Sequence, residues 1–273
     1  FILHLIPSGI LYPEVRCLLG NGVVVDPWVL AEEMDSLRAR GIELEGRLGV
    51  SQRAHLVLPY HRALDMAEEN SLGESKIGTT GQGIGPAYQD KIVRRGLRFG
   101  DLVTVDRTHT IIANGVERTN IALAGFGNDS RLDTDEVMAS IEEVRDTMLA
   151  LVTDTGDEIR TGITAGGRVL LEGAQGALLD IDHGTYPFVT SSTTTAGGAA
   201  SGVGIGPTLI DGVLGVVKAY ITRVGAGPLP TELSGADAEH LRRLGGEFGA
   251  TTGRPRRPGW FDATVARHAA HVN

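Results

Sequence analysis

The sequence has 273 residues, 41% of them hydrophobic, and a formal net charge of −9. This is enough for one large α/β domain, or two small ones, around a sizeable core. The acidic balance without a basic patch argues against a nucleic-acid-binding protein, and no apolar run approaches the roughly 20 residues that span a bilayer. The single cysteine, Cys17, allows no internal disulfide, and no charged leader or cleavage site is visible. We therefore expect a cytoplasmic protein.

Alternating strand and helix patterns open the chain. Phe1–Ile6 is a short strand candidate, Val23–Val25 is a β-branched run typical of a buried strand, and His55–Leu58 is a third candidate. Asp26 is placed to cap a helix that begins at Pro27, because proline at the first helical position sacrifices no hydrogen bond. The apolar face of that helix is Leu30, Met34 and Leu37, and Gly41 ends it. A polar helix is predicted over His61–Asn70.

The stretch 77–95 carries the first candidate site. Gly78, Gly81, Gly83 and Gly85 alternate with hydroxyl, amide and apolar residues, and the basic residues Lys91, Arg94 and Arg95 follow on a predicted helix. Glycines let backbone N–H groups turn towards a ligand, and basic residues supply fixed positive charge. The pattern favours a phosphate-bearing small molecule. An ordinary glycine-rich turn before a helix stays open as the alternative.

Residues 101–167 differ in character. Asn114-Gly115 lies between two β-branched runs, which predicts a β-hairpin. Asp133 and Glu136 have the spacing of a capping box at the start of a helix. The core face of that helix is Val137, Ile141, Val144, Met148 and Leu151. This face predicts packing and no function.

The second informative stretch is 168–198. Arg168–Leu171 is a strand candidate, and small polar residues follow it. Ligands of open α/β sheets bind just beyond the carboxyl ends of strands, where Gln175 lies. Its amide both donates and accepts, so it can recognise the lactam edge of a purine, or it can cap its own loop. Asp182 and His183 are an acid–base pair only if their side chains converge, and adjacent residues on a turn usually diverge.

A basic turn forms the third candidate site. A buried strand is predicted over Gly212–Ala219, a glycine-rich turn follows Arg223, and a short helix is predicted over Ala238–Leu244. Residues 249–259 then place three arginines, 254, 256 and 257, behind two threonines and a glycine. Arginine binds carboxylate and phosphate through a planar fork of donors. We interpret this turn as an anion site rather than a solvated basic surface.

Several of these stretches together resemble the adenylosuccinate synthetase family. The matching segments, in the family's order, are 4–10, 77–98, 172–198, 223–232 and 247–260. The resemblance implies an α/β, P-loop NTPase-like fold with a largely parallel central sheet, incomplete at both ends. All 273 residues would form one partial domain, with residues 101–167 a more divergent, partly helical insertion.

The family joins IMP and L-aspartate with GTP and Mg²⁺, through a 6-phosphoryl-IMP intermediate, in AMP biosynthesis. By resemblance, Thr80 and Thr190 contact the IMP phosphate, Val224 contacts its ribose, and Gln175 holds the 6-oxygen edge of the base. Lys91 lies in the signature marked as an active-site lysine.

The basic residues take their roles from the same resemblance. Arg94 would reach the IMP site of the other subunit of a homodimer. Arg254 would also touch IMP, and Arg256 would touch GTP. The loop that closes on aspartate corresponds to Ala250, Thr251, Thr252, Gly253, Arg254, Pro255 and Arg256. Thr193 stands where the family has asparagine.

Some family segments are absent from this sequence. It has no Gly-Asp-Glu-Gly-Lys-Gly-Lys phosphate loop, which carries the general base and a metal ligand, no Gly-His-Thr segment and no Lys-x-Asp segment that reads guanine. We therefore expect the Mg²⁺ ligands outside this chain, no metal site within it, and no turnover by the chain alone. Two alternatives stay open: a non-catalytic nucleotide-binding remnant, and a viral-type relative that uses deoxyguanylate.

Overall fold

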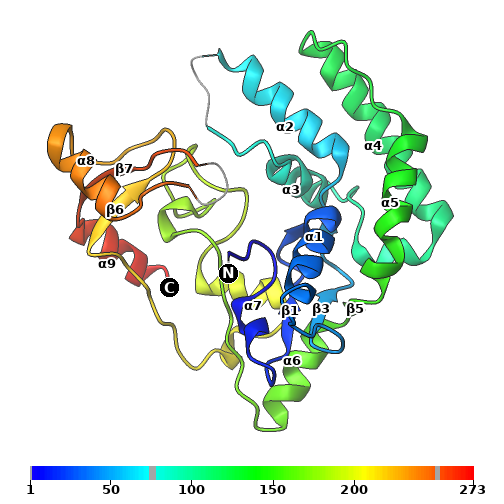
Figure 1. The fold of residues 1–273 in the computed structure, drawn as a ribbon, viewed down its shortest axis with the longest axis horizontal. Coiled ribbons are helices and arrows are strands. Elements are labelled where there is room, and N and C mark those ends of the chain that lie inside the picture. Colours follow the sequence, from blue (N-terminus) through cyan, green and yellow to red (C-terminus); the bar gives the residue numbers. More distant parts are fainter. Residues whose placement is uncertain (1, 74–77, 250–252) are drawn as a thin grey trace.

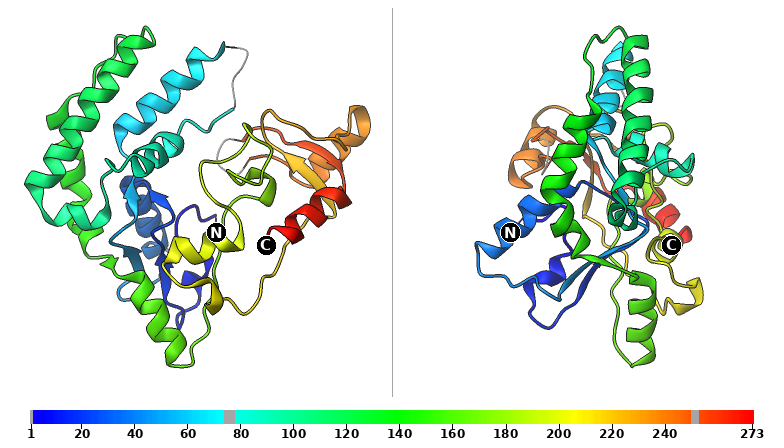
Figure 2. Two further views of the ribbon diagram at one scale, coloured as in Figure 1. Left: turned by 180° about the vertical axis from the view of Figure 1, so that it is seen from behind. Right: turned by 90° about the vertical axis from the view of Figure 1, so that its right-hand side faces the viewer.

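The structure is a computed structural model that describes residues 2–73, 78–249 and 253–273. In Figure 1 the strands β1, β3 and β5 and the helices α1 to α6 gather into one body. The strands β6 and β7 and the helices α8 and α9 form a second group beside it. Figure 2 shows the same separation from behind. Of the candidate site residues, Thr80, Lys91 and Arg94 belong to the body, and Val224, Arg254 and Arg256 belong to the second group. Gln175 and Thr190 lie in the segment that connects α6 to α7.

Parallel strand pairs form the sheets of the body. β3 (Leu48–Ser51) lies between β1 (Cys17–Leu19) and β5 (Val152–Thr153), and it is parallel to both. β2 (Val24–Val25) and β4 (His55–Leu56) form a second parallel pair. Parallel strands need a crossover between them, which is why helices alternate with strands here. The predicted α/β class with parallel pairing is confirmed.

The first crossover helix, α1 (Pro27–Arg38), follows its sequence signals closely. The Asp26 side chain accepts hydrogen bonds from Trp28 N and Val29 N, both at 3.1 Å, and Pro27 occupies the first turn. Leu30, Met34 and Leu37 are at most 1% exposed. The predicted cap, start and apolar face are confirmed, because all three depend on neighbours within one or two helical turns.

The other helices of the body are α2 (Pro59–Ser71), α3 (Ile84–Ile92), α4 (Val105–Gly125), α5 (Thr134–Leu149) and α6 (Thr155–Thr164). The predicted start of α5 and most of its apolar face are confirmed, since Asp133 caps the helix and Val137, Ile141 and Met148 are buried. Val144 is half-buried, and Leu151 is buried just beyond the end of the helix. The polar helix predicted over 61–70 is α2. None of the described helices combines the length and apolar character that crossing a bilayer requires.

The hairpin predicted at Asn114-Gly115 is wrong, because both residues lie in the middle of α4. This helix packs against α2 and α5 and buries Ile112 and Val116 at 0% and 3% exposure. A Cβ added to Gly115 would lie 2.5 Å from Cζ of Tyr60 on α2. The glycine therefore permits close helix packing and does not mark a turn.

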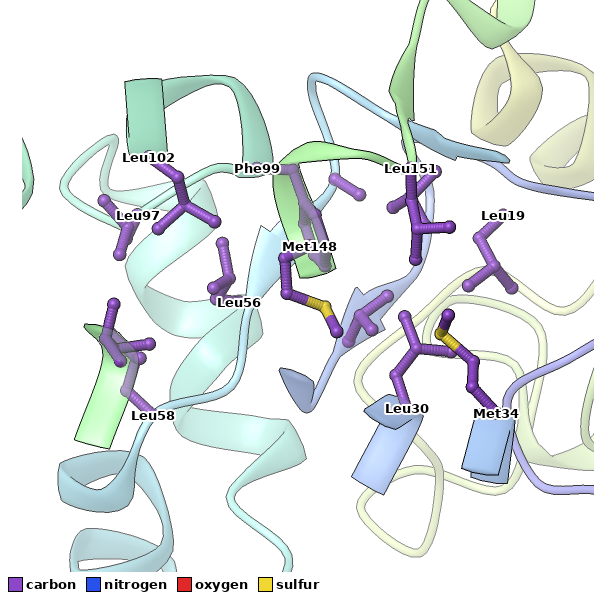
Figure 3. Close-up of a cluster of buried hydrophobic side chains, with 14 of the residues drawn as sticks. Leu19, Leu30, Met34, Leu56, Leu58, Leu97, Phe99, Leu102, Met148 and Leu151 are labelled. Atoms are coloured by element: carbon purple, nitrogen blue, oxygen red, sulfur yellow. The ribbon is translucent and has the colours of Figure 1, made fainter. Parts of the chain in front are cut away.

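The elements of the body pack around one main hydrophobic core (Figure 3). Side chains from β1, α1, β4, α5 and the segment 97–102 meet in it. The side chains labelled in the figure are Leu19, Leu30, Met34, Leu56, Leu58, Leu97, Phe99, Leu102, Met148 and Leu151. Tyr60 of α2 belongs to this core, whereas α3 packs through Ala87 on a second, smaller cluster with Val24 and Val57. The connection between these two helices carries the glycine-rich turn.

The C-terminal part pairs its two strands in antiparallel fashion, Tyr220 with Trp260 and Arg223 with Arg257. The elements are α7 (Ala196–Val203), β6 (Tyr220–Arg223), α8 (Gly235–Leu244), β7 (Arg257–Trp260) and α9 (Ala263–His271). Short 3₁₀ turns are η1 (Ser8–Leu11), η3 (Phe99–Val103), η4 (Ala177–Leu179) and η5 (Pro207–Leu209). The predicted short helix before the basic turn is α8.

Three strand predictions are not confirmed. Residues 2–6, the described part of the first candidate, are irregular, and the backbone N–H groups of His4, Leu5 and Ile6 donate to the Glu33 carboxylate instead of a neighbouring strand. The segments 168–171 and 212–218 have no strand partner among the described residues. Their apolar side chains are exposed, Leu170 and Leu214 at 89% each and Val216 at 93%. A buried strand needs neighbours, and the described residues supply none.

Candidate functional site

The glycine-rich turn between α2 and α3 is anchored by two carboxylates of α2. Gly78 N donates to Glu69 Oε1 at 2.7 Å, and Gly83 N donates to Asp65 Oδ2 at 2.8 Å. A Cβ on Gly83 would lie 2.7 Å from Arg62 N, so only glycine fits there at its φ of 76°. Two of the amides predicted to face a ligand therefore face the protein. They fix the path of the turn, and Thr79 and Thr80 between them are exposed.

The two helices that hold this turn are joined by a buried polar network that no sequence pattern indicated. His61 Nδ1 accepts from Leu58 N at 3.0 Å, so its Nε2 carries the proton and donates to Asp90 at 3.2 Å. Asp90 also accepts from Arg95 Nε at 2.6 Å. Burial raises the pKa of Asp90, but the hydrogen bonds from His61 and Arg95 outweigh it and leave the pKa below its usual value.

Arg254 connects the basic turn to the glycine-rich turn. Its Nη2 donates to Gly78 O at 3.1 Å and to Thr79 O at 2.9 Å. A Cβ added to Gly78 would also lie 3.7 Å from Gly225 Cα. Turns from three distant parts of the sequence therefore meet at one place. Thr80, Val224 and Arg254 were each predicted as site residues, and each belongs to one of these turns or directly adjoins it.

Asp180 shapes the polar stretch that contains Gln175 and Thr190. It is fully buried and accepts from the backbone N–H groups of Asp182, His183 and Thr194 at 3.0, 2.9 and 2.6 Å. Burial raises its pKa, but these backbone donors outweigh it and the pKa lies below its ordinary value. Asp182 and His183 thus use their amides to build the loop, and their side chains are exposed.

Gln175 and Thr190 occupy the same folded loop. Gln175 is exposed and has a left-handed φ of 64°, and Thr194 Oγ1 donates to the carbonyl of the next residue, Gly176, at 3.2 Å. Thr190 N donates to Leu179 O at 2.8 Å. A Cβ on Gly85 in the first turn of α3 would lie 3.5 Å from Ser191 Oγ. The loop therefore lies beside the start of α3, next to Gly85, which is five residues after Thr80.

Arg223 connects this loop to a different turn, residues 224–227, which contains Val224. Its guanidinium donates to Phe188 O at 2.7 Å, to Thr185 Oγ1 at 3.0 Å and to Ala226 O at 2.8 Å. Val224, the predicted ribose contact, is 38% exposed. Thr80, Thr190, Val224 and Arg254 are thereby linked through short chains of contacts.

The described residues on either side of 250–252 are hydrogen-bonded to each other and form the base of the basic turn, here called the hairpin. Gly249 N donates to Arg254 O and Gly253 N donates to Gly249 O, both at 2.8 Å, and Pro255 bridges to Phe248. Ala250, Thr251 and Thr252, predicted to bind aspartate, lie outside the described residues. Arg256 donates through Nη1 to the buried carboxylate of Glu247 at 2.8 Å. Glu247, Asp65 and Glu69 were not predicted as functional residues, because each acts through a partner 9 to 18 positions away that no local sequence pattern indicates.

Lys91 is engaged with backbone in this structure. Its Nζ donates to Asn21 O at 2.7 Å and lies 5.7 Å from the centre of the Tyr88 ring, whose hydroxyl donates to Gly22 O at 2.9 Å. Burial lowers the pKa of Lys91. These contacts hold the turn before β2 against α3. The catalytic role of Lys91 stays a prediction.

Arg94 lies apart from the converging turns. It follows the end of α3 with a left-handed φ of 63° and is exposed. It lines a surface cavity of about 500 Å³ between α3 and α4, together with Arg95, Gly96, Thr104, Asp106, Arg107, Thr110 and Ile111. None of these residues belongs to the turns at 78–83, 224–227 or 253–256. Within one chain, the structure does not bring Arg94 to the other predicted IMP residues.

The sequence is similar to known proteins over its whole length. The adenylosuccinate synthetase family model matches residues 1–273. Adenylosuccinate synthetases of Saccharophagus degradans and Frankia casuarinae are 52% and 53% identical over 272 and 273 residues. They cover 100% of this chain, which spans 63% and 64% of their own lengths.

Two solved structures are similar as well. Fully ligated adenylosuccinate synthetase from Plasmodium falciparum has a TM-score of 0.92 at 37% identity, covering 100% of this chain and 63% of that one. A cyanophage S-2L succinoaminodeoxyadenylate synthetase, bound to dGMP and dATP, has a TM-score of 0.64 at 26% identity, covering 100% and 67%. Together with the converging turns, these matches show that the chain belongs to the adenylosuccinate synthetase family.

Proposed function

We propose that the protein containing this chain joins IMP and L-aspartate to form adenylosuccinate, with GTP as the phosphoryl donor. The observation that carries the proposal is the contact of Arg254 with the carbonyls of Gly78 and Thr79. It joins the turn proposed for the nucleotide phosphate to the turn proposed for the amino acid. Because the chain spans less than two thirds of its relatives' length, turnover is assigned to the intact protein.

The chemistry explains why such a site must hold two anionic substrates together. The 6-oxygen of IMP is a poor leaving group, and transfer of the γ-phosphoryl of GTP to it gives 6-phosphoryl-IMP and GDP. The amino group of aspartate then attacks C6, the C6–O bond breaks, and phosphate leaves. Phosphoryl transfer depends mainly on positioning and charge stabilisation, which fixed turns with arginines provide.

We assign the IMP contacts to four exposed or half-buried groups around the start of α3. Thr80 and Thr190 bind the phosphate, Val224 contacts the ribose, and Gln175 donates to the base oxygen as charge develops there. The N-terminus of α3 adds favourable positive potential for the phosphate. In support, Thr190 adjoins Ser191, which lies beside the first turn of α3.

Aspartate is assigned to the hairpin 250–256. A dicarboxylic amino acid needs planar cationic partners, and Arg254 and Arg256 are two residues apart on the same turn. Arg254 also faces IMP in this proposal, since it already bonds to the nucleotide-binding turn, and Arg256 extends to GTP.

Mg²⁺ would neutralise phosphate charge during the transfer. Within residues 2–73, 78–249 and 253–273, no three His, Cys, Asp or Glu side chains gather as metal ligands would. We therefore assign none of the described residues to the metal.

The face around Arg94 supports a homodimer in which this arginine serves the partner's IMP site. Exposed apolar side chains flank it, Ile92 at 76%, Val93 at 46% and Val103 at 65%. An apolar surface around a cationic cavity is suited to a protein interface. Mixing full-length Arg94→Leu and Gln175→Ala proteins should restore activity, because mixed dimers contain one site without either substitution. Failure to restore any activity would contradict sharing.

The direct test is turnover by the full-length protein with IMP, aspartate and GTP, followed as adenylosuccinate formation. Gln175→Ala should reduce kcat by about 100-fold or more, as expected for loss of a donor to developing charge. Tight IMP binding without turnover would favour the non-catalytic alternative. Replacing IMP by dGMP tests the deoxyguanylate alternative, which has less support because the cyanophage enzyme is less similar in both sequence and structure.

A further inference from the structure

Glu247 is the most heavily engaged buried carboxylate of the C-terminal group, and no role in the proposed reaction has been given to it. It is 2% exposed, lies three residues after α8, and precedes the basic hairpin. Lys218 Nζ donates to both of its oxygens at 2.7 and 2.8 Å, and Tyr220 Oη donates at 2.6 Å. Arg256 Nη1 donates at 2.8 Å. A buried charge is retained only when it is paired in this way.

The main chain of Glu247 holds the same arginine that its side chain holds. Arg256 N donates to Glu247 O at 2.9 Å, and Glu247 N donates to Arg242 O at 2.9 Å. Arg242 Nε in turn donates to Arg256 O at 3.0 Å. Residues 242, 247 and 256 thus form a closed ring of hydrogen bonds at the base of the hairpin.

The contact leaves part of the Arg256 guanidinium available. Only Nη1 is bonded to Glu247, and none of the described residues accepts from Nη2 or Nε of Arg256. A guanidinium fork recognises carboxylate or phosphate through two parallel donors. Held at one end by Glu247, the fork presents its remaining donors in a fixed orientation.

The carboxylate stays charged under all physiological conditions. Burial raises the pKa of Glu247, but the donors Lys218, Tyr220 and Arg256 lower it further, to about 2. It therefore offsets the adjacent positive charges of Lys218 and Arg256 without itself facing a substrate. Without it, two cations would lie close together at the base of the hairpin, and like charges at such range repel.

We infer that Glu247 is a positioning residue: its buried carboxylate aligns Arg256 and fixes the base of the hairpin, so that Arg254 and Arg256 meet the aspartate carboxylates. The inference rests on the proposed function for the identity of the substrate. It adds a residue that acts through Arg256 and not by touching substrate.

The test uses the full-length protein with Glu247→Gln, which keeps the shape and removes the charge. The kcat/KM for aspartate should fall about 10- to 100-fold, since small misplacements of a positioning group cost up to about that much. The KM for IMP should change less. The matched control is Asp237→Asn in the first turn of α8, an exposed residue outside the ring of residues 242, 247 and 256. It should behave like the wild type.

A double substitution separates positioning from a general structural role. If Glu247 acts through Arg256, adding Glu247→Gln to Arg256→Ala should reduce kcat/KM for aspartate by less than about 2-fold further. The inference would be overturned if the fold-losses in kcat/KM for aspartate of the two single variants multiplied in the double variant. It would also be overturned if Glu247→Gln weakened aspartate and IMP binding equally and greatly lowered Tm.

A readout independent of activity keeps this inference distinct from the proposed function. Amide hydrogen exchange at Gly249, Gly253 and Arg256 should be at least about 10-fold faster in Glu247→Gln than in the wild type, because the base of the hairpin loosens. Unchanged exchange would overturn the role of Glu247 whatever the enzyme does. Absent turnover in the wild type with altered exchange in the variant would refute only the proposed function.

Discussion

Gly115 offers a sharp test of the helix packing that supports the candidate site. It lies in the middle of α4, and a Cβ at this position would approach Tyr60 Cζ to 2.5 Å and both Cε1 and Oη to 2.8 Å. Tyr60 is 2% exposed and belongs to α2, the helix whose carboxylates anchor the glycine-rich turn. Gly115→Ala therefore forces either a buried ring or a helix to move.

Two opposing effects decide the sign of this substitution. Alanine is about 1 kcal/mol more favourable than glycine inside a helix. Overpacking of a core costs about 1–3 kcal/mol, and a rigid ring at 2.5 Å belongs at the upper end of that range. We expect Gly115→Ala to lower the free energy of unfolding by about 1–2 kcal/mol despite the better helix former.

The matched control is Gly125→Ala at the end of the same helix, where no atom lies within 4 Å of the added Cβ. It should leave stability unchanged or raise it by up to about 1 kcal/mol. Thermal unfolding of the full-length protein measures both, and the Tm of the two variants should differ by a few degrees, since about 1 kcal/mol shifts Tm by roughly 2–4 °C in a large domain. If Gly115→Ala is as stable as the control, α2 and α4 are not packed as described.

Two other predictions concern His55 and the exposed segment 212–218. Burial, with the charges of Lys91 and Arg98, lowers the pKa of His55 from 6.5 to about 4. Between these values the unfolded chain binds a proton that the folded chain does not, so stability falls as the pH drops through this window. His55→Leu should reduce the difference in Tm between about pH 7 and about pH 5; an unchanged difference would mean that another group titrates. Leu214→Ser should lower the free energy of unfolding of the full-length protein by about 2 kcal/mol or more if the segment is a buried strand there, and by less than about 0.5 kcal/mol if it stays exposed, as chemical denaturation can measure.

Local signals predicted the elements whose causes are local. The Asp26 cap, the Pro27 start and the apolar face of α1 are each set by residues within a few positions, and the same holds for α5. The glycine-rich turn before α3 was also located from its sequence, while its role as a phosphate site stays a prediction. The meeting point of the three candidate turns was not predictable from spacing, since Arg254 reaches Gly78 across 176 positions.

The roles of the carboxylates that hold the turns could not be predicted from the sequence. Asp65, Glu69 and Glu247 look like ordinary acidic residues of an acidic chain, and only the tertiary structure reveals that they hold the turns. The hairpin error has the same origin, because Asn-Gly is a turn signal only when no neighbouring helix needs the space that glycine leaves.

The segments 168–171 and 212–218 are the opposite case. Their sequences predict buried strands, but the described residues provide no partner strand for them. Continuous apolar runs are typical of strands buried on both faces, yet Leu170, Leu214 and Val216 are almost fully exposed. An extended apolar edge is a template for pairing with another strand, and proteins do not normally leave one uncovered. Gln175 lies four residues after the first of these segments, and Lys218, which donates to Glu247, ends the second. A strand that paired with the two segments would therefore also restrain Gln175 and, through Lys218, the basic turn, so the Leu214→Ser measurement bears on function as well as on stability.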